Sequence, residues 1–128
     1  MTHFVTKTFS KGEFIIKEGE IGEEAFIINS GNVEIIKYTV NKKAVGIATL
    51  GPGDLFGEMS LFDEEKRSAS AIAINEVEIR IIHKQDFVRQ LQNTPPEIRY
   101  ILELILERLR KTSALISKIK VESNKYYV

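Results

Sequence analysis

The sequence of 128 residues contains no cysteine, and its charges cancel. Without cysteine there is no disulfide framework, no thiol nucleophile and no zinc–thiolate site. Eighteen basic side chains balance eighteen acidic ones, so the strongly basic face of a free-standing nucleic-acid-binding protein is not expected. No apolar run approaches membrane-spanning length, and the first twelve residues lack the apolar core of a signal peptide. These absences favour a cytoplasmic protein with one domain.

Histidine is also scarce, with only His3 and His83, at opposite ends of the first part of the chain. A metal-dependent barrel enzyme of the cupin type would need a cluster of histidines with a carboxylate. The acidic run at 63–65 has adjacent carboxylates without partner ligands, which is typical of a solvated loop tip. No nucleophile–base pair or pair of catalytic carboxylates falls within one element. We therefore expect neither a metal site nor an enzyme.

The sequence up to about Ile82 has the pattern of a β domain. Short segments rich in Ile, Val and Phe, namely EFIIKEG, EEAFIINSGNVEIIKYTV and KAVGIATL, predict strands. NSGN and VNKKAV predict hairpin turns, and LGPGD predicts a sharp reversal. Val77, Ile79 and Ile81 then alternate with charged residues, as in a half-buried strand. Many short strands with regular turns indicate a small sandwich or barrel.

After His83 the pattern becomes helical. KQDFVRQLQN predicts a short amphipathic helix, and TPPE predicts the start of a second helix capped by Thr94. This second helix can run to about Lys120 without a Gly or Pro. Its residues at alternating spacings of four and three form the seam of a coiled coil: Ile98, Leu102, Ile105, Leu109, Thr112, Ile116 and Ile119.

A second apolar strip on the same helix includes Ile101, Leu104 and Leu115. Two strips indicate two partners, so we expect one to pack on the β domain and the other to form a homodimer. The alternative is that all of this surface packs within one subunit. Thr112 is the polar residue of the seam, where it either sets the register of the coiled coil or contacts a ligand.

The chemistry of a binding site is concentrated around Arg67. Four small residues follow it, Ser68 to Ala71, so a bulky ligand could approach the backbone. A planar, permanently charged guanidinium suits a phosphate. Upstream, FGEMSL can form one helical turn after Gly57, with its N–H groups directed at an anion.

Glu58 would repel a phosphate, but its carboxylate can accept a hydrogen bond from a sugar hydroxyl beside it. A phosphate next to a ribose hydroxyl indicates a nucleotide. The alternative is a plain salt bridge between Glu58 and Arg67 across a turn, with the small residues fitting a crowded strand pair.

The segment GDLFGEMSLFDEEKRSASA resembles the phosphate-binding cassette of cyclic-nucleotide-binding domains. FSKGEFIIKEGEIGEEAFIINSGNVEII, with turn glycines Gly19 and Gly31, is similar to the first strands of that family. The resemblance covers essentially the whole chain. It implies an α+β fold in a single domain, residues 1–128: an antiparallel, jelly-roll-like β-roll at 1–83 with the cassette at 56–71, then C-terminal helices at 84–120.

The resemblance also implies roles for individual residues. Glu58 would accept from the 2′-hydroxyl, Arg67 would pair with the exocyclic phosphate oxygens, and Ser68 would contact the phosphate or the base edge. ERLRKTSALI is similar to the dimer helix of the catabolite-activator branch, in which a Thr and a Ser face the adenine amino group; Arg108 would reach toward Glu58. The implied ligand-binding residues are Phe56, Gly57, Glu58, Met59, Ser60, Arg67, Ser68, Ala69, Thr112 and Ser113.

The predicted function is a non-catalytic, homodimeric sensor that binds cyclic AMP, with cyclic GMP as the other candidate ligand. Ser68 is compatible with either purine, whereas Thr112 and Ser113 favour adenine. The DNA-binding domain of the catabolite-activator branch has no counterpart in these residues, so direct nucleic-acid binding is not expected. The alternatives are a dimerisation module that binds no nucleotide, and the sensor half of a transcription regulator. The segment 121–128 has no clear pattern.

Overall fold

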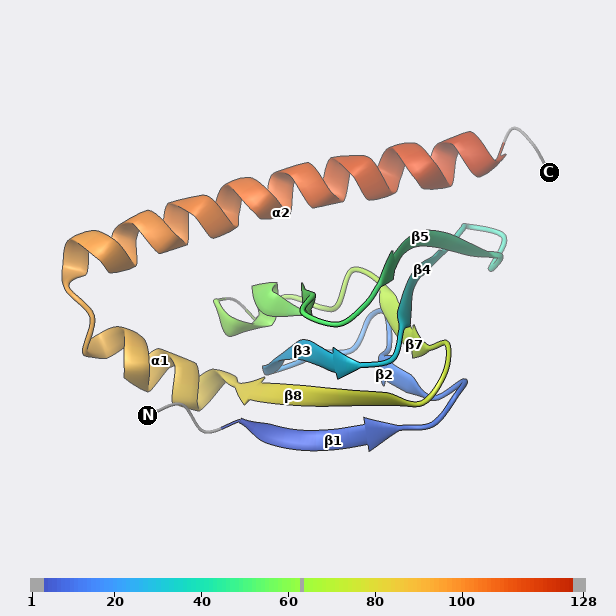
Figure 1. Ribbon diagram of the computed structural model, residues 1–128. Helices are drawn as coiled ribbons and strands as arrows, with labels where there is room; N and C mark the ends of the chain where they lie inside the picture. Colours follow the sequence, from blue (N-terminus) through green and yellow to red (C-terminus); the bar gives the residue numbers. More distant parts are fainter. Residues whose placement is uncertain (1–3, 63, 126–128) are drawn as a thin grey trace.

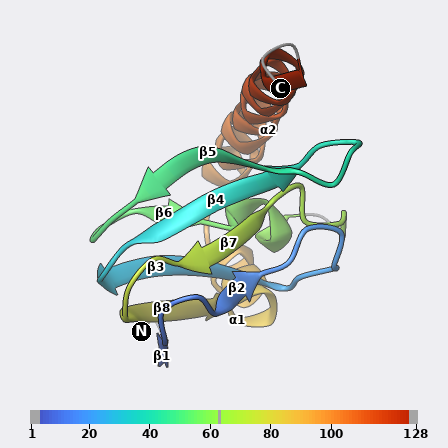
Figure 2. The same cartoon turned by 90° about the vertical axis from the view of Figure 1, so that its right-hand side faces the viewer.

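The computed structural model describes the backbone of residues 4–62 and 64–125, with side chains described as far as Leu109 and for Lys111. Two four-stranded antiparallel sheets form a β-roll, and two helices follow it (Figures 1 and 2). The first sheet has the order β1 (Val5–Phe9), β8 (Val77–His83), β3 (Glu24–Ser30), β6 (Leu55–Phe56). The second has the order β2 (Phe14–Ile16), β7 (Ser70–Ala73), β4 (Val33–Tyr38), β5 (Ala44–Leu50). The predicted α+β fold is confirmed.

The core lies between the two sheets and follows the alternation of the strands. Val77, Ile79 and Ile81 of β8 are buried, and the intervening Glu78 is exposed. β3 and β4 contribute Ile28 and Val33, which are almost completely buried. Because successive side chains of a strand point to opposite faces, this alternation places one face of each sheet in the core. The strand prediction for residues 77–81 is confirmed.

The two predicted hairpin turns have different outcomes. β4 and β5 pair along their length, so VNKKAV is a hairpin, closed by Thr39 N–H donating to the carbonyl of Lys43. β3 and β4, which flank Gly31, belong to different sheets, so the hairpin predicted at NSGN is wrong. The chain crosses between the sheets there instead. Gly31 has φ +87°, and a Cβ at this position would clash with the carbonyl oxygen of Glu76.

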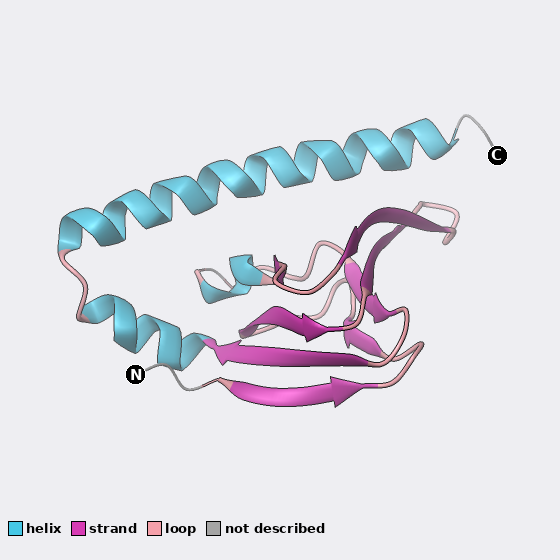
Figure 3. Cartoon of the chain, viewed as in Figure 1, coloured by secondary structure: helices cyan, strands magenta, loops and turns pink. Residues whose placement is uncertain are grey.

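Three helical segments follow the pattern of the sequence closely (Figure 3). The 3₁₀ turn η1 (Glu58–Leu61) begins after Gly57, and α1 (Lys84–Gln92) continues directly from β8. α2 (Pro96–Lys125) extends five residues beyond the predicted end. The cap predicted at Thr94 is wrong, because its hydroxyl donates to the carbonyl of Gln90 at the end of α1. In the first turn of α2, the amides of Ile98 and Arg99 donate to the carbonyl of Pro95.

α2 runs across the β-roll above β4 and β5 (Figure 1), yet its described part leaves large apolar side chains exposed. The seam residues Ile98, Leu102, Ile105 and Leu109 are between 37% and 54% exposed. Ile101 and Leu104 are 53% and 46% exposed, so the prediction that their strip packs on the roll is wrong for these two residues. The alternative, that all of the apolar surface packs within one subunit, does not hold for residues 98–109 either. Among the helices that the structure describes, none has the length and apolar character needed to cross a membrane.

Candidate functional site

A cavity of about 340 Å³ opens beside η1, within the range of small-molecule sites. β2, β4, β5 and β6 give it an apolar wall, and the cassette gives it a polar side. The lining residues are Ile16, Ile35, Ile47, Leu55, Phe56, Gly57, Glu58, Met59, Ser60, Glu65, Lys66, Arg67, Ser68, Ala69, Ser70 and Ala71. Every predicted ligand-binding residue of the cassette is therefore at the cavity. Thr112 and Ser113 fall within α2, but their side chains lie outside the described residues.

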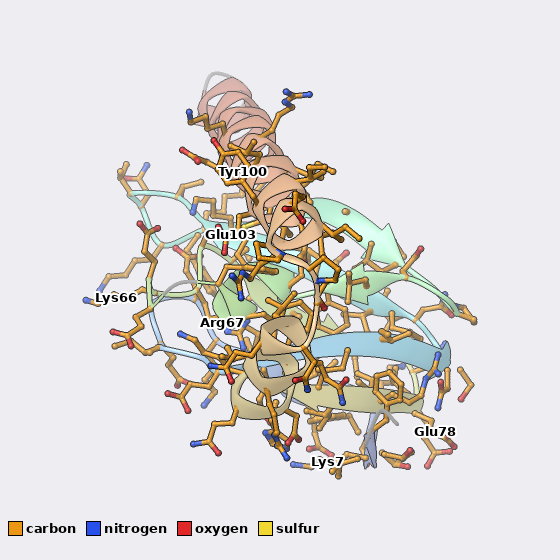
Figure 4. All side chains as sticks on the ribbon, turned by 90° about the vertical axis from the view of Figure 1, so that its left-hand side faces the viewer. Lys7, Lys66, Arg67, Glu78, Tyr100 and Glu103 are labelled. Atoms are coloured by element: carbon orange, nitrogen blue, oxygen red, sulfur yellow. The ribbon has the colours of Figure 1, made fainter. Side chains whose placement is uncertain are left out.

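Arg67 is held in place along its whole length. Its backbone N–H donates to the carbonyl of Glu20, and its carbonyl accepts from the N–H of Gly19. Nη1 donates to the carbonyl of Gly57 over 3.1 Å, and Nη2 donates to the carbonyl of Glu24 over 2.9 Å. The guanidinium lies over the ring of Phe26, 5.7 Å from its centroid. Figure 4 shows Arg67 directed into the molecule, while the neighbouring Lys66 lies at its edge.

The charge of Arg67 is not neutralised by a contacting carboxylate. None of the ion pairs found among residues 4–62 and 64–109 involves Arg67, so the salt bridge with Glu58 considered above is not formed. Burial lowers the pKa of Arg67, and the nearby charges of Glu24 and Glu58 oppose this effect. A guanidinium has five N–H donors, and two neutral carbonyls occupy only part of that capacity. An anion in the cavity would restore the charge balance that burial disturbs.

Gly57 immediately precedes η1 and lies against the guanidinium of Arg67. Its φ of +73° starts the 3₁₀ turn, and a Cβ there would lie 2.9 Å from Nη1 of Arg67. The same Cβ would lie 3.1 Å from side-chain carbons of Ile16 and Phe26. Ser60 and Leu61 are buried, which packs the turn against the rest of the domain. The one-turn helix predicted after Gly57 is confirmed, and its amides begin at the rim of the cavity.

All four small residues after Arg67 line the cavity, and Ser70 and Ala71 are also buried in the strand packing. Ser70 is buried, and its hydroxyl accepts from the backbone N–H of Glu18. Ala71 is fully buried in the core. Ser68 and Ala69 line the cavity, and the carbonyl of Ser68 accepts from Nζ of Lys37. The small side chains of residues 68–71 therefore allow close packing of the strands and leave room for a ligand in the cavity.

Sequence reasoning missed several residues of this site. Glu24 and Phe26 reach it because β3 pairs with β6, which places Phe26 opposite Phe56 with their rings stacked 5.1 Å apart. Gly22 lies directly against the guanidinium of Arg67. Ile35 and Ile47 come from the β4–β5 hairpin. The alternating apolar residues of β4 and β5 could have indicated that Ile35 and Ile47 face one side of the hairpin. The pairing of β3 with β6 could not be predicted, because no local sequence pattern specifies it.

The charged and titratable residues outside the cavity are dispersed. His83 Nδ1 lies 3.6 Å from a carboxylate oxygen of Glu24, and both side chains are part exposed. In the described ranges, no group of three or more His, Asp or Glu side chains could hold a metal ion. In the predicted loop tip, Asp63 lies outside the described residues, Glu64 is exposed, and Glu65 is exposed at the edge of the cavity that it lines.

The family model of the cyclic nucleotide-binding domain matches residues 6–94. The chain therefore belongs to the cyclic nucleotide-binding domain family, and the cavity at the cassette lies within the matched region. Domains of this family bind a nucleotide for regulation rather than catalysis.

Within this family, the chain is similar to catabolite activator proteins. It is 30% identical to the cyclic AMP receptor protein of Thermus thermophilus, over 95% of the chain and 56% of that protein. It superposes on the crystal structure of the Thermus thermophilus catabolite activator protein with a TM-score of 0.73, at 30% identity, over 91% of this chain and 55% of that one. The chain thus spans about half the length of this relative.

Relatives with other architectures contain similar domains. A cGMP-dependent protein kinase of Plasmodium berghei is 34% identical over 93% of the chain, which is 13% of the kinase. The cAMP-bound form of the EAL enzyme Bd1971 superposes with a TM-score of 0.71 at 33% identity, over 96% of this chain and 32% of the enzyme. Both cyclic purine nucleotides are therefore represented among the names of these relatives.

Proposed function

We propose that the chain is a non-catalytic, homodimeric sensor whose preferred ligand is cyclic AMP, with cyclic GMP as a weaker one. The observation that carries this proposal is the guanidinium of Arg67, held at a cavity of about 340 Å³ without a carboxylate partner among the described ion pairs. Leaving a buried charge unpaired is costly unless an anion completes it. The similarity to the cyclic AMP receptor protein supports the choice of ligand.

Each part of the cavity has a counterpart in the proposed ligand. Arg67 pairs with the exocyclic phosphate oxygens, which the amides at the start of η1 also face. Glu58 accepts a hydrogen bond from the ribose 2′-hydroxyl. Ser68 donates to the phosphate or to the base edge. The apolar wall formed by Ile35, Ile47 and Leu55 receives the base.

The exposed seam of α2 supports the proposed homodimer. Four apolar side chains at coiled-coil spacing, described above, remain in contact with water in the single chain. Pairing two α2 helices removes them from water, at about 25 cal/mol for each Å² of apolar surface. We propose that Thr112 and Ser113 then face the adenine amino group, with the serine reaching across the dimer. Nucleotide affinity and helix geometry are linked in such an arrangement.

Two further parts of the proposal follow from the relatives. A regulator described as cAMP-activated and transcriptional in Mycobacterium tuberculosis is 35% identical over 82% of the chain and 47% of that protein. We propose a cytoplasmic setting for this chain. We do not assign DNA binding to residues 1–128, because their net charge is zero and the matched family region ends at residue 94.

Isothermal titration calorimetry with cyclic AMP, cyclic GMP and adenosine tests this proposal. We expect saturable binding of one cyclic AMP per chain, weaker binding of cyclic GMP, and much weaker binding of adenosine, which lacks the phosphate. Arg67→Ala should reduce affinity for cyclic AMP by about 2 kcal/mol, or about 30-fold, and leave adenosine almost unchanged. No heat with either cyclic nucleotide at millimolar concentration would favour a dimerisation module that binds no nucleotide.

A further inference from the structure

Gly22 differs from the other glycines of the chain, because a neighbouring side chain rather than its backbone conformation requires a glycine there. Five glycines have positive φ, which explains their identity by backbone conformation alone. Gly22, Gly46 and Gly51 do not. A Cβ on Gly46 would meet its nearest atom, a carboxylate oxygen of Glu34, at an ordinary 3.6 Å, and one on Gly51 would lie 3.3 Å from an amide nitrogen. Backbone strain therefore does not account for Gly22.

A Cβ on Gly22 would coincide with the guanidinium of Arg67. The three atoms nearest to it are Nε, Nη2 and Cζ, all within the guanidinium plane and all well inside 3.0 Å. Contacts below 3.0 Å require one group to move. Gly22 therefore provides the flat backbone surface on which the guanidinium lies.

Contacts at both ends hold the arginine in its position over Gly22. Its backbone is hydrogen-bonded to Gly19 and Glu20, and Ile21, the residue before Gly22, forms a bridge with Lys66. The far end of the side chain is bonded to the carbonyls of Glu24 and Gly57. The side chain thus crosses Gly22 between two fixed ends. Moving it outward by the width of a methyl group breaks both carbonyl hydrogen bonds and withdraws the guanidinium from its place over Phe26.

From this geometry we propose that Gly22 is a positioning residue for the anion site: it acts through Arg67 by fixing where the guanidinium meets the phosphate. This inference rests on the proposed function for its effect on nucleotide binding, but its effect on Arg67 is independent of any ligand. Both effects can be measured with a double-mutant cycle, which isolates the coupling of two contacting residues.

The binding half of the cycle compares Gly22→Ala, Arg67→Ala and the double variant by calorimetry with cyclic AMP. We expect Gly22→Ala to weaken binding about 10- to 100-fold, as for the loss of a charge-assisted contact. In the Arg67→Ala background the same change should alter affinity by less than about 2-fold, because no guanidinium remains to be displaced. Gly46→Ala is the matched control and should bind as the wild type does.

The stability half uses the same variants without nucleotide, by thermal unfolding. Gly22→Ala should lower the melting temperature when Arg67 is present. In the Arg67→Ala background it should leave the melting temperature unchanged or raise it by about 2–4 °C, because Gly→Ala at an ordinary φ restricts the unfolded chain. This change of sign is not expected if the segment needs a glycine for its own conformation.

The outcomes separate the two ideas. If the wild type binds no cyclic nucleotide but the thermal cycle shows the coupling, the proposed function fails and Gly22 still positions Arg67. If Gly22→Ala costs as much stability in the Arg67→Ala background as it does when Arg67 is present, the inference is wrong. It is equally wrong if the affinity of Gly22→Ala for cyclic AMP equals that of the wild type. A Gly22→Ala change that unfolds the protein in both backgrounds costs the same stability with and without Arg67, so it also contradicts the inference.

Discussion

Replacing Gly57 with alanine tests the packing of the site in a way that can be calculated from the structure. The backbone term is the cost of an L-residue in the left-handed region, about 1–2 kcal/mol, because Gly57 has φ +73°. The packing term comes from a Cβ 3.1 Å from Ile16 and Phe26, both buried, and 2.9 Å from Arg67. Overpacking of this kind costs about 1–3 kcal/mol. The two terms together amount to about 2–5 kcal/mol.

Gly53→Ala is the matched control for the backbone term. Gly53 has φ +90°, but a Cβ there would meet nothing within 4 Å. We expect it to cost about 1–2 kcal/mol. Thermal unfolding followed by circular dichroism measures both variants, and a domain of this size loses about 3–5 °C per kcal/mol. Gly57→Ala should therefore melt on the order of 10 °C below the wild type and clearly below Gly53→Ala. Equal melting temperatures for the two variants would refute the packing described around Gly57.

Three further predictions concern binding and assembly. Glu58→Gln should weaken cyclic AMP binding by about 1–2 kcal/mol, because a charged acceptor becomes neutral; the same loss with the 2′-deoxy analogue would exclude the proposed contact. Leu102→Glu should shift the mass in solution measured by light scattering from dimer to monomer, whereas Tyr100→Glu, outside the seam, should not; a dimer in both variants would exclude this interface. Thr112→Ala with Ser113→Ala should reduce the preference for cyclic AMP over cyclic GMP in calorimetry, and an unchanged ratio would remove both residues from the base contact.

Local patterns in the sequence predicted much of the fold. The alternation at Val77, Ile79 and Ile81 gave the buried face of β8 correctly, since side-chain direction in a strand depends only on its period of two. The turn at NSGN was wrongly assigned as a hairpin because a two-residue turn can join strands of one sheet or of two. The choice depends on which partners β3 and β4 find elsewhere in the chain, and a local pattern does not contain that information.

The cassette was predictable because its residues are close together in the sequence. Glu58 and Arg67 are joined by one short loop, so their common position at the cavity follows from local chemistry. Glu24 and Phe26 were missed because the pairing of β3 with β6 brings that strand to the site. Gly22 was missed because it reaches Arg67 through the bridge between Ile21 and Lys66, which are far apart in the sequence. The cap at Thr94 was misplaced because its hydroxyl had two helix ends within reach and bonded to the preceding one.

The most direct test of the anion site is the structure of the protein crystallised with cyclic AMP. We expect the cyclic phosphate at the start of η1, with its exocyclic oxygens about 2.7–2.9 Å from the guanidinium nitrogens of Arg67. The carboxylate of Glu58 should accept from the 2′-hydroxyl. A nucleotide bound away from this cavity, or an Arg67 guanidinium that turns to solvent while the nucleotide occupies it, would contradict the role assigned to Arg67.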